Sequence, residues 1–169
     1  MSEAAARRRV GVISDTHDLV RPEALCALRG SDLVLHAGDI CGPDVLQALR
    51  EIAPVIAVRG NNDHGRWADA VPETAIVELG SVSVLMVHDI ETLRPGATRG
   101  VRVVISGHSH RPSKEVRDGV LYFNPGSAGP RRFTLPVSLG RLDVTGDRVR
   151  TTLVDLGRPR DARRAIIAP

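Results

Sequence analysis

The sequence contains few aromatic residues, two cysteines and no long apolar run. Its 169 residues include only one Trp, one Tyr and two Phe, too few for a surface that stacks nucleic-acid bases. No run approaches the roughly 18 apolar residues of a membrane-spanning helix, and residues 1–9 lack the apolar segment of a signal peptide. Cys26 and Cys41 have no Cys-x-x-Cys spacing, so we expect two free, buried thiols. These absences favour a cytoplasmic protein without a membrane partner.

The formal net charge of +3 is concentrated in the ends of the chain. Of the 23 basic residues, seven arginines lie in segments 1–9 and 158–164, where Glu3 and Asp161 are the only acids. The remainder holds 16 basic and 18 acidic residues, so the charge does not mark a nucleic-acid surface there. We expect flexible basic termini at 1–8 and 158–169, a single domain at 9–157 and no specific nucleic-acid partner. A nucleic-acid-binding protein that uses its basic ends is the alternative from another functional class.

Short apolar segments separated by turn residues predict ten strands and two helices. Continuous apolar runs that alternate with helical segments in the first half predict a βαβαβ unit and a parallel sheet. Turn signals such as Asp118-Gly119 predict hairpins in the second half. The sequence therefore predicts an α/β fold of two packed, mixed β-sheets flanked by helices. The predicted strands are 9–14, 32–36, 55–58, 74–79, 82–87, 101–105, 114–117, 120–123, 136–144 and 148–156, and the predicted helices are 21–29 and 43–52.

Five polar clusters follow predicted strands, each where the strand ends. Because the carboxyl ends of strands in α/β sheets converge on one crevice, we expect these side chains to lie close together. Carboxylates, imidazoles and a carboxamide are the usual ligands of divalent metal ions. Seven candidate ligands exceed the needs of one ion, whereas two ions about 3.5–4 Å apart that share a carboxylate would use them all. The candidates are Asp15, His17, Asp39, Asn61, His88, His108 and His110.

The motifs, taken together, resemble those of the calcineurin-like metallophosphoesterases. They are Asp15-x-His17, Gly38-Asp39, Gly60-Asn61-x-Asp63, His88 and Gly107-His108-x-His110. The segment Asn124-Pro125-Gly126-Ser127 and the small size resemble the YfcE-type bacterial phosphodiesterases, a branch that includes the eukaryotic retromer subunit. The resemblance implies an αββα sandwich and an enzyme that hydrolyses small phosphate esters. Phosphodiesters are the substrate class that it favours. A non-catalytic protein-interaction scaffold of the same fold is the alternative, and the oligomeric state stays open.

The resemblance also implies a role for each ligand. The first ion would be held by Asp15, His17, Asp39 and His110, and the second by the bridging Asp39 with Asn61, His88 and His108. The implied catalytic residues are Asp39, Asn61 and His88: a hydroxide between the ions attacks phosphorus, with Asn61 near the phosphate. The implied cofactors are two divalent ions, Mn²⁺ in first place and Zn²⁺, Fe or Ni²⁺ as alternatives.

One position departs from the pattern of many relatives. Asn62 follows Asn61, where many relatives have a histidine that protonates the leaving group. The YfcE-type branch often lacks that histidine too, so its absence does not argue against activity. His64 is either an ordinary loop histidine or a substitute proton donor.

For other polar residues near the motifs, structural roles are favoured over roles in catalysis. Asp89 follows His88 where relatives often have Gly-His, so the rim of the pocket is expected to differ. His36 is expected to be a structural histidine or one that supports the ligands. Three arginines are expected at the surface rather than on a phosphate, namely Arg66, Arg131 and Arg132.

Overall fold

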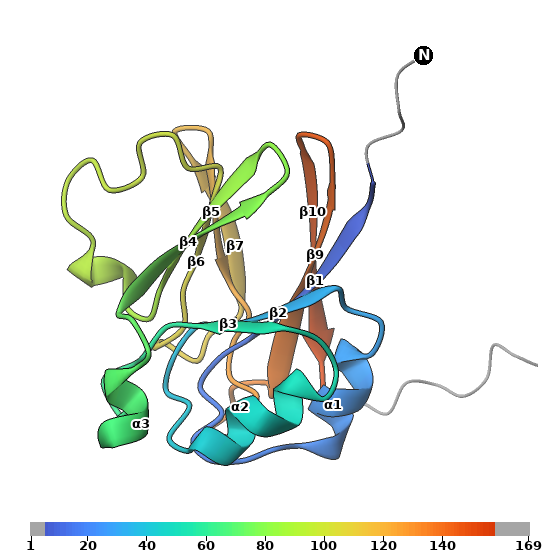
Figure 1. Ribbon diagram of the computed structural model, residues 1–169, viewed down its shortest axis with the longest axis vertical. Coiled ribbons are helices and arrows are strands. Elements are labelled where there is room, and N and C mark those ends of the chain that lie inside the picture. Colours follow the sequence, from blue (N-terminus) through green and yellow to red (C-terminus); the bar gives the residue numbers. More distant parts are fainter. Residues whose placement is uncertain (1–5, 158–169) are drawn as a thin grey trace, which may run out of the picture.

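Two five-stranded β-sheets face each other in the computed structural model, which describes residues 6–157 (Figure 1). The first sheet has the order β10 (Arg148–Asp155), β9 (Ser138–Thr145), β1 (Arg8–Ile13), β2 (Leu33–His36) and β3 (Val55–Ala57). The second has the order β4 (Thr74–Leu79), β5 (Val82–Val87), β6 (Val103–Ile105), β8 (Val120–Asn124) and β7 (Ser113–Arg117). Each sheet mixes parallel and antiparallel pairs. The predicted α/β sandwich of two mixed sheets is confirmed, and all ten predicted strands are present.

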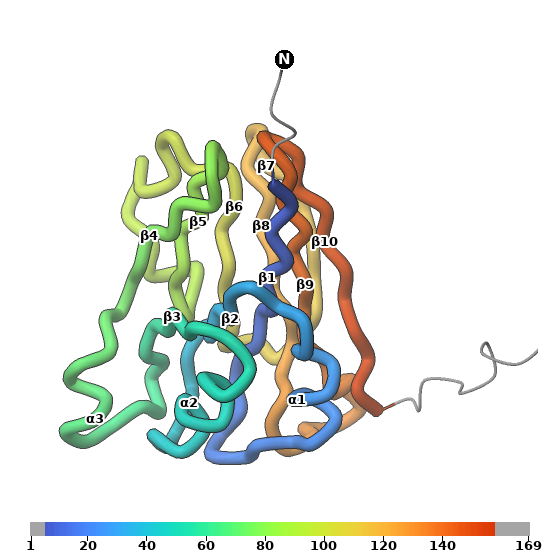
Figure 2. Tube along the Cα trace, turned by 45° about the vertical axis from the view of Figure 1, so that its right-hand side comes forward, coloured from blue at the N-terminus to red at the C-terminus, as the bar shows by residue number. Residues whose placement is uncertain are grey.

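The parallel strands β1, β2 and β3 are connected by α1 (Pro22–Leu28) and α2 (Pro43–Arg50). A proline in the first turn of each helix fixes φ and removes an N–H that would have no partner. Both helices pack on the outer face of the first sheet, in an apolar cluster that includes Ile13 and Val34 (Figure 2). The loops after β1, β2 and β3 are therefore collected at one edge of this sheet.

The main apolar core lies between the two sheets. Alternate residues of each strand face it, among them Val10 and Val12 of β1 and Val84 and Met86 of β5. Phe123 of β8 is the largest side chain in this core. Each such burial stabilises the fold by about 1.5–3 kcal/mol. The core thereby fixes the loops of one sheet relative to those of the other.

Two short helical elements were not predicted from the sequence. They are α3 (Arg66–Asp69) and the 3₁₀ turn η1 (Ile90–Thr92), and segments this short show no helical period. Ile90 and Leu93 pack on Leu85 and Val104 at the outer face of the second sheet. Within residues 6–157, this face is covered by the irregular segment that follows β5, whereas both longer α-helices cover the first sheet.

The N-terminal boundary lies slightly earlier than predicted. Arg8 is the first residue of β1, and Arg7 donates hydrogen bonds of 3.0 and 2.7 Å to the Asp143 carboxylate on β9. The expected flexible segment 1–8 therefore overlaps with the sheet, because a carboxylate of the neighbouring strand fixes Arg7. The other residues of the expected basic termini, 1–5 and 158–169, lie outside the described residues.

The two cysteines are free, as predicted, but the predicted burial is wrong. Cys26 is exposed because it occupies the solvent side of α1, whose buried side is formed by Ala24, Ala27 and Leu28. Cys41 is half-buried in the loop after β2. Among the described residues, no helix is long and apolar enough to span a membrane.

Candidate metal centre

Five of the seven predicted ligands converge at the ends of β1, β2, β5 and β6. Their donor atoms form two groups of three, and within each group all donor atoms lie within 4.8 Å of one another. The first group is Asp15, His17 and His110, and the second is Asp15, Asp39 and His88. The two groups share Asp15, so the structure brings together side chains from four loops around one buried carboxylate.

The first group is held by short contacts between its donor atoms. His110 Nε2 lies 3.2 Å from Asp15 Oδ1 and 3.3 Å from His17 Nε2. Two ring nitrogens that face each other at this distance and also face a carboxylate oxygen form three sides of a cation-binding site. Asp15 and His110 are buried, whereas His17 is only half-buried, so this group is the more open of the two.

The second group contains the clearest evidence for ligand orientation. His88 Nδ1 lies 2.7 Å from the Ala37 carbonyl oxygen, so Nδ1 must carry the proton and donate it. His88 Nε2 therefore presents its lone pair, and it points at Asp39 Oδ1 (3.4 Å) and Asp15 Oδ1 (4.0 Å). A backbone carbonyl that fixes the ring in this way is the usual support of a metal-binding histidine.

Asp39 directs one carboxylate oxygen to each group. Oδ1 faces His88, whereas Oδ2 lies 3.8 Å from His17 Nε2. The Asn62 backbone N–H donates to Oδ1 (2.8 Å) and its side-chain amide to Oδ2 (2.7 Å). Burial alone would raise the pKa of Asp39, but these hydrogen bonds and the His88 ring outweigh it and lower the pKa. Asp39 is therefore held as a carboxylate with an oxygen on either side, a geometry that suits a bridging ligand.

The remaining two predicted ligands, Asn61 and His108, lie at the rim of the site. His108 Nδ1 and Asn61 Oδ1 are 3.0 Å apart, and the His108 ring lies edge-on to the His88 ring with centroids 5.2 Å apart. Both residues are exposed. They belong to neither group of three, but they place two further donor atoms beside the second group.

The backbone at the site adopts a conformation that side chains rarely accept. Positive φ angles occur at five of the seven predicted ligands: Asp15 (53°), His17 (46°), Asp39 (53°), His108 (66°) and His110 (58°). A left-handed conformation at a non-glycine residue is uncommon and costs about 1–2 kcal/mol. Such strain is typical of functional sites, and here it turns consecutive side chains toward the same point.

The protonation states of two histidines reflect their opposite surroundings. Burial lowers the pKa of His17, and the Arg132 guanidinium adds to this effect against the attraction of Asp39. Burial would also lower the pKa of His88, but the neighbouring Asp39 carboxylate and the Ala37 carbonyl outweigh it and raise the pKa. A neutral His17 can act as a ligand near neutral pH, whereas at His88 a metal ion would compete with a proton for Nε2.

Three buried polar atoms of the site have no hydrogen-bond partner among the described residues: Asp15 Oδ1, His88 Nε2 and His110 Nδ1. An unsatisfied buried carboxylate oxygen is costly unless a cation or another donor compensates it. Two of these atoms are also donor atoms of the second group. The donor set, its unsatisfied atoms and its two carboxylates therefore fit divalent cations.

Several supporting residues were not predicted. The Ser14 hydroxyl donates to Asp15 Oδ2 (2.7 Å), and the Ser127 hydroxyl donates to the Asp15 carbonyl (2.9 Å). Asp63 accepts hydrogen bonds from the backbone N–H groups of Gly60 (2.6 Å) and Cys41 (2.7 Å). Ser127 and Asp63 lie in the quoted motifs, so spacing marked their positions but not their partners. Ser14 gave no signal beyond its place before Asp15.

His36 is a fully buried structural histidine, as predicted. Its Nδ1 accepts from the Gly38 backbone N–H (3.2 Å), so its Nε2 carries the proton and donates to the Thr16 hydroxyl (3.0 Å). Thr16 in turn donates to the Ile40 carbonyl (3.3 Å). Burial lowers the pKa of His36 to about 3, so a neutral ring connects the loops after β1 and β2.

Arg132 lies at the surface, as expected. Its guanidinium nevertheless lies 3.3 Å from His17 Nε2, because the loop after Ser127 returns to the site. Arg66 and Arg131 are exposed, as expected, and so is His64.

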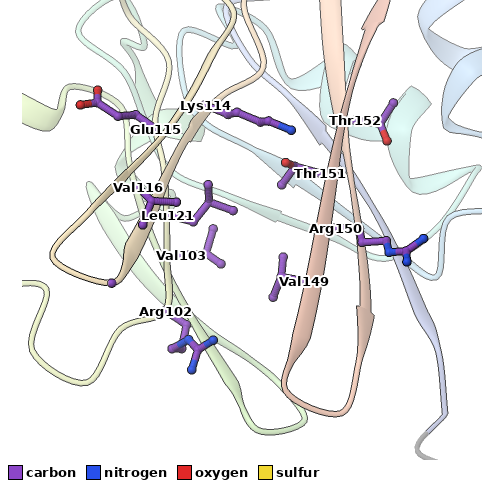
Figure 3. A pocket seen from close by; sticks show the side chains of 11 residues that line it. Arg102, Val103, Lys114, Glu115, Val116, Leu121, Val149, Arg150, Thr151 and Thr152 are labelled. Atoms are coloured by element: carbon purple, nitrogen blue, oxygen red, sulfur yellow. The ribbon is translucent and has the colours of Figure 1, made fainter.

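Two cavities differ in their relation to this centre. The larger of the two, about 700 Å³, is a groove between the edge strands β7 and β10 that is lined by none of the seven ligands (Figure 3). Val116 and Leu121 line one wall and Val149 the other, while Lys114 points across the groove. A smaller cavity of about 290 Å³ is lined by His108. The groove between β7 and β10 therefore lies away from the candidate ligands, whereas the smaller cavity adjoins them.

Comparisons with known proteins agree with the geometry. The calcineurin-like phosphoesterase superfamily domain matches residues 9–147. A probable metallophosphoesterase of Methanothermobacter thermautotrophicus is 38% identical over 164 residues, which cover 89% of this chain and 94% of the relative. Vacuolar protein sorting 29 from Cryptosporidium parvum has a TM-score of 0.77 and 21% identity, with 92% of this chain and 93% of that chain covered. YfcE, a phosphoesterase from E. coli, has a TM-score of 0.63 and 28% identity, with 80% and 88% covered.

Proposed function

Since the chain belongs to the calcineurin-like phosphoesterase superfamily, we propose that it hydrolyses phosphodiesters with two divalent metal ions. Mn²⁺ is the first expectation for the metal, with Zn²⁺, Fe and Ni²⁺ as alternatives, because mixed nitrogen and oxygen ligands do not separate them. The observation that carries the proposal is the pair of three-residue groups around Asp15, with unsatisfied atoms on Asp15 and His88.

The buried carboxylates Asp15 and Asp39 and the imidazoles of His17, His88 and His110 would hold the ions. When bound, the ions would supply an activated water molecule and neutralise charge on the phosphoryl oxygens. Asn61 and His108 lie at the open side, where a phosphate enters. Arg132 adds a guanidinium at the same mouth and can bind a phosphate oxygen once His17 is engaged by metal.

Metal-dependent turnover is the direct test of this proposal. The chain is stripped of metal and assayed with each candidate ion against bis-p-nitrophenyl phosphate and p-nitrophenyl phosphate. We expect turnover only with metal, with the diester preferred. Asp39→Ala should abolish it and His110→Ala should weaken it, while Glu51→Gln, an exposed carboxylate at the end of α2, should behave like the wild type.

Absence of turnover with every metal and both esters would contradict the proposal. It would favour the alternative, a protein-interaction scaffold of the same fold. The likeness to vacuolar protein sorting 29 supports that alternative at the level of the fold. A scaffold has no need for unsatisfied ligand atoms in a buried site, which is why hydrolysis is the first proposal.

A further inference from the structure

The cavity of about 290 Å³ beside His108 lies on the outer face of the second sheet. Tyr122 and Asn124 of β8 line it, and they share one face of the sheet because side chains alternate along a strand. Glu115 of β7 pairs directly with Tyr122 and so lies on that face too. Ser106, two residues after the outward-facing Val104, completes the base. The cavity is therefore built on the sheet and opens next to a predicted metal ligand.

The lining of this cavity is strongly acidic. Three carboxylates line it, from Asp89, Glu91 and Glu115, against the single guanidinium of Arg117. Arg117 is already engaged, because it lies 2.7 Å from Glu115 Oε2 and stacks over the Tyr122 ring at 5.1 Å. Counting only carboxylates and guanidinium, three negative charges and one positive leave a formal charge of −2. The cavity thus attracts a cation or a donor of several hydrogen bonds.

Ser106 gives a second, independent indication of a ligand. It is only 6% exposed, it lines the cavity, and its hydroxyl has no hydrogen-bond partner among the described residues. Its oxygen is not one of the fully buried, unsatisfied atoms, so the hydroxyl is open to the cavity and free to accept a hydrogen bond from a ligand. Together with the carboxylates, it makes the cavity a set of acceptors.

We propose that this cavity binds one organic arm of the phosphodiester and selects a small arm that ends in a primary ammonium group, such as 2-aminoethyl. The proposal rests on the proposed function, because it takes the phosphate to sit at the neighbouring centre. The volume is at the low end of the roughly 300–1,000 Å³ of ligand sites, which favours a short arm. A primary ammonium donates three hydrogen bonds and so matches the Ser106 hydroxyl and the surrounding carboxylates better than a quaternary ammonium does.

The test compares three p-nitrophenyl phosphodiesters whose second arm is 2-aminoethyl, n-propyl or 2-carboxyethyl. The first two arms are nearly isosteric and differ mainly in charge. We expect kcat/KM to fall in the order 2-aminoethyl, n-propyl, 2-carboxyethyl. Glu91→Gln and Glu115→Gln should each reduce the ratio of kcat/KM for the 2-aminoethyl ester to kcat/KM for the n-propyl ester. The reduction should be on the order of 5-fold, which is typical of one partly exposed charge pair. Because both carboxylates line the cavity, the loss should be larger for the 2-aminoethyl ester than for the propyl ester.

Glu73→Gln is the matched control, since Glu73 is exposed and pairs with Arg59 away from the cavity. Equal rates for the first two esters in an active enzyme would overturn the inference and leave the proposed function intact. If no ester is hydrolysed, calorimetric titration of the Zn²⁺-loaded chain with 2-aminoethyl phosphate and with propyl phosphate decides. If 2-aminoethyl phosphate binds more tightly than propyl phosphate, and Glu91→Gln weakens that binding, the cavity selects an ammonium arm even though the proposed hydrolysis fails. Equal binding would overturn the inference.

Discussion

At the scale of the residue, the site depends on which atoms carry protons. The Ala37 carbonyl forces the proton of His88 onto Nδ1, and the Gly38 N–H forces the proton of His36 onto Nε2. The first arrangement presents a lone pair to the centre, and the second connects two loops. Asn62 donates twice to Asp39, so it orients the expected bridging ligand. As a carboxamide, it cannot serve as a general acid near neutral pH.

The first prediction concerns the missing acid. Protonation of the leaving oxygen is typically worth about 10²–10⁴-fold in rate, so its absence makes the rate depend steeply on the pKa of the leaving group. Aryl esters should react much faster than alkyl esters. Asn62→His should selectively help alkyl esters, and metal content measured in parallel shows whether Asp39 still binds.

The exposed His64 offers the competing explanation. If it supplied the proton, a series of diesters would give a shallow slope in the wild type, and His64→Ala would steepen it. A shallow wild-type slope contradicts the first prediction, whatever the variants do.

The second prediction concerns His36 and pH. Its pKa is about 3 in the folded chain, against an ordinary value of 6.5. The unfolded chain therefore takes up a proton as pH falls below about 6.5, while the folded chain does not until pH approaches about 3. The stability that the neutral ring contributes is complete above that window and decreases through it, by at most about 1.4 kcal/mol per pH unit.

Urea unfolding of the metal-free wild type and His36→Gln at several pH values measures this effect. The difference in free energy of unfolding between the two should shrink as pH falls from 6.5 to 4. Other histidines titrate in both proteins and cancel in the difference. A difference that does not change with pH would show that His36 is not the buried neutral ring described above.

At the scale of the element, the site is made by strand ends whose backbone turns sharply. The strands, and the positions of the candidate ligands after them, were predictable because apolar runs mark the strands and polar clusters follow them. The left-handed residues, Arg132 and the Ser14 contact were not predictable, because they depend on loops from distant parts of the chain that meet only in the fold. Likewise, α3 and η1 are too short to have a period. The grouping around Asp15 also comes from tertiary structure, since sequence alone does not order ligands in space.

The third prediction tests the loop after β2. Gly38 has a φ of 96°, and a Cβ there would lie 2.6 Å from His88 Nδ1 and 2.9 Å from the Gly60 nitrogen. Gly38→Ala should therefore destabilise the chain by about 3 kcal/mol or more and weaken metal binding by about 10–100-fold, because it displaces the fixed His88 ring. Denaturant unfolding and metal titration measure the two effects.

Gly119→Ala provides the matched control. Gly119 has a φ of 78°, but no atom lies within 4 Å of a Cβ placed there. Its substitution should cost only the backbone term of about 1–2 kcal/mol and leave metal affinity unchanged. Equal effects of the two substitutions on metal affinity would mean that the close approach of Gly38 to His88 is unimportant.

At the scale of the whole molecule, the apolar core between the sheets holds the loops of β1 and β2 against those of β5 and β6. This is what allows buried Asp15 and Asp39 to lie together, at a cost in like-charge repulsion that a cation relieves. Without metal, the two neighbouring buried carboxylates therefore make the fold less stable than it is with a bound cation.

The fourth prediction follows from that balance. Metal at about 100 times its dissociation constant should raise the free energy of unfolding by about 2.7 kcal/mol per site. In Asp15→Asn the metal effect should be lost, yet the metal-free variant should be at least as stable as the metal-free wild type, because one of two buried charges is gone. Thermal unfolding with and without chelator checks both. A variant that is less stable without metal and still stabilised by it would contradict this account.

The fifth prediction is also the most direct test of the central claim: the number of metal ions per chain, with the identity of their ligands. Metal-loaded protein, freed of excess ion, is measured by elemental analysis, and the ions are located by anomalous scattering. We predict about two ions per chain, about 3.5–4 Å apart, held by Asp15, His17, Asp39, Asn61, His88, His108 and His110. Asp39→Ala should lose both ions, and His110→Ala mainly the first. Saturation at one ion, or ligands outside these seven, would contradict the account.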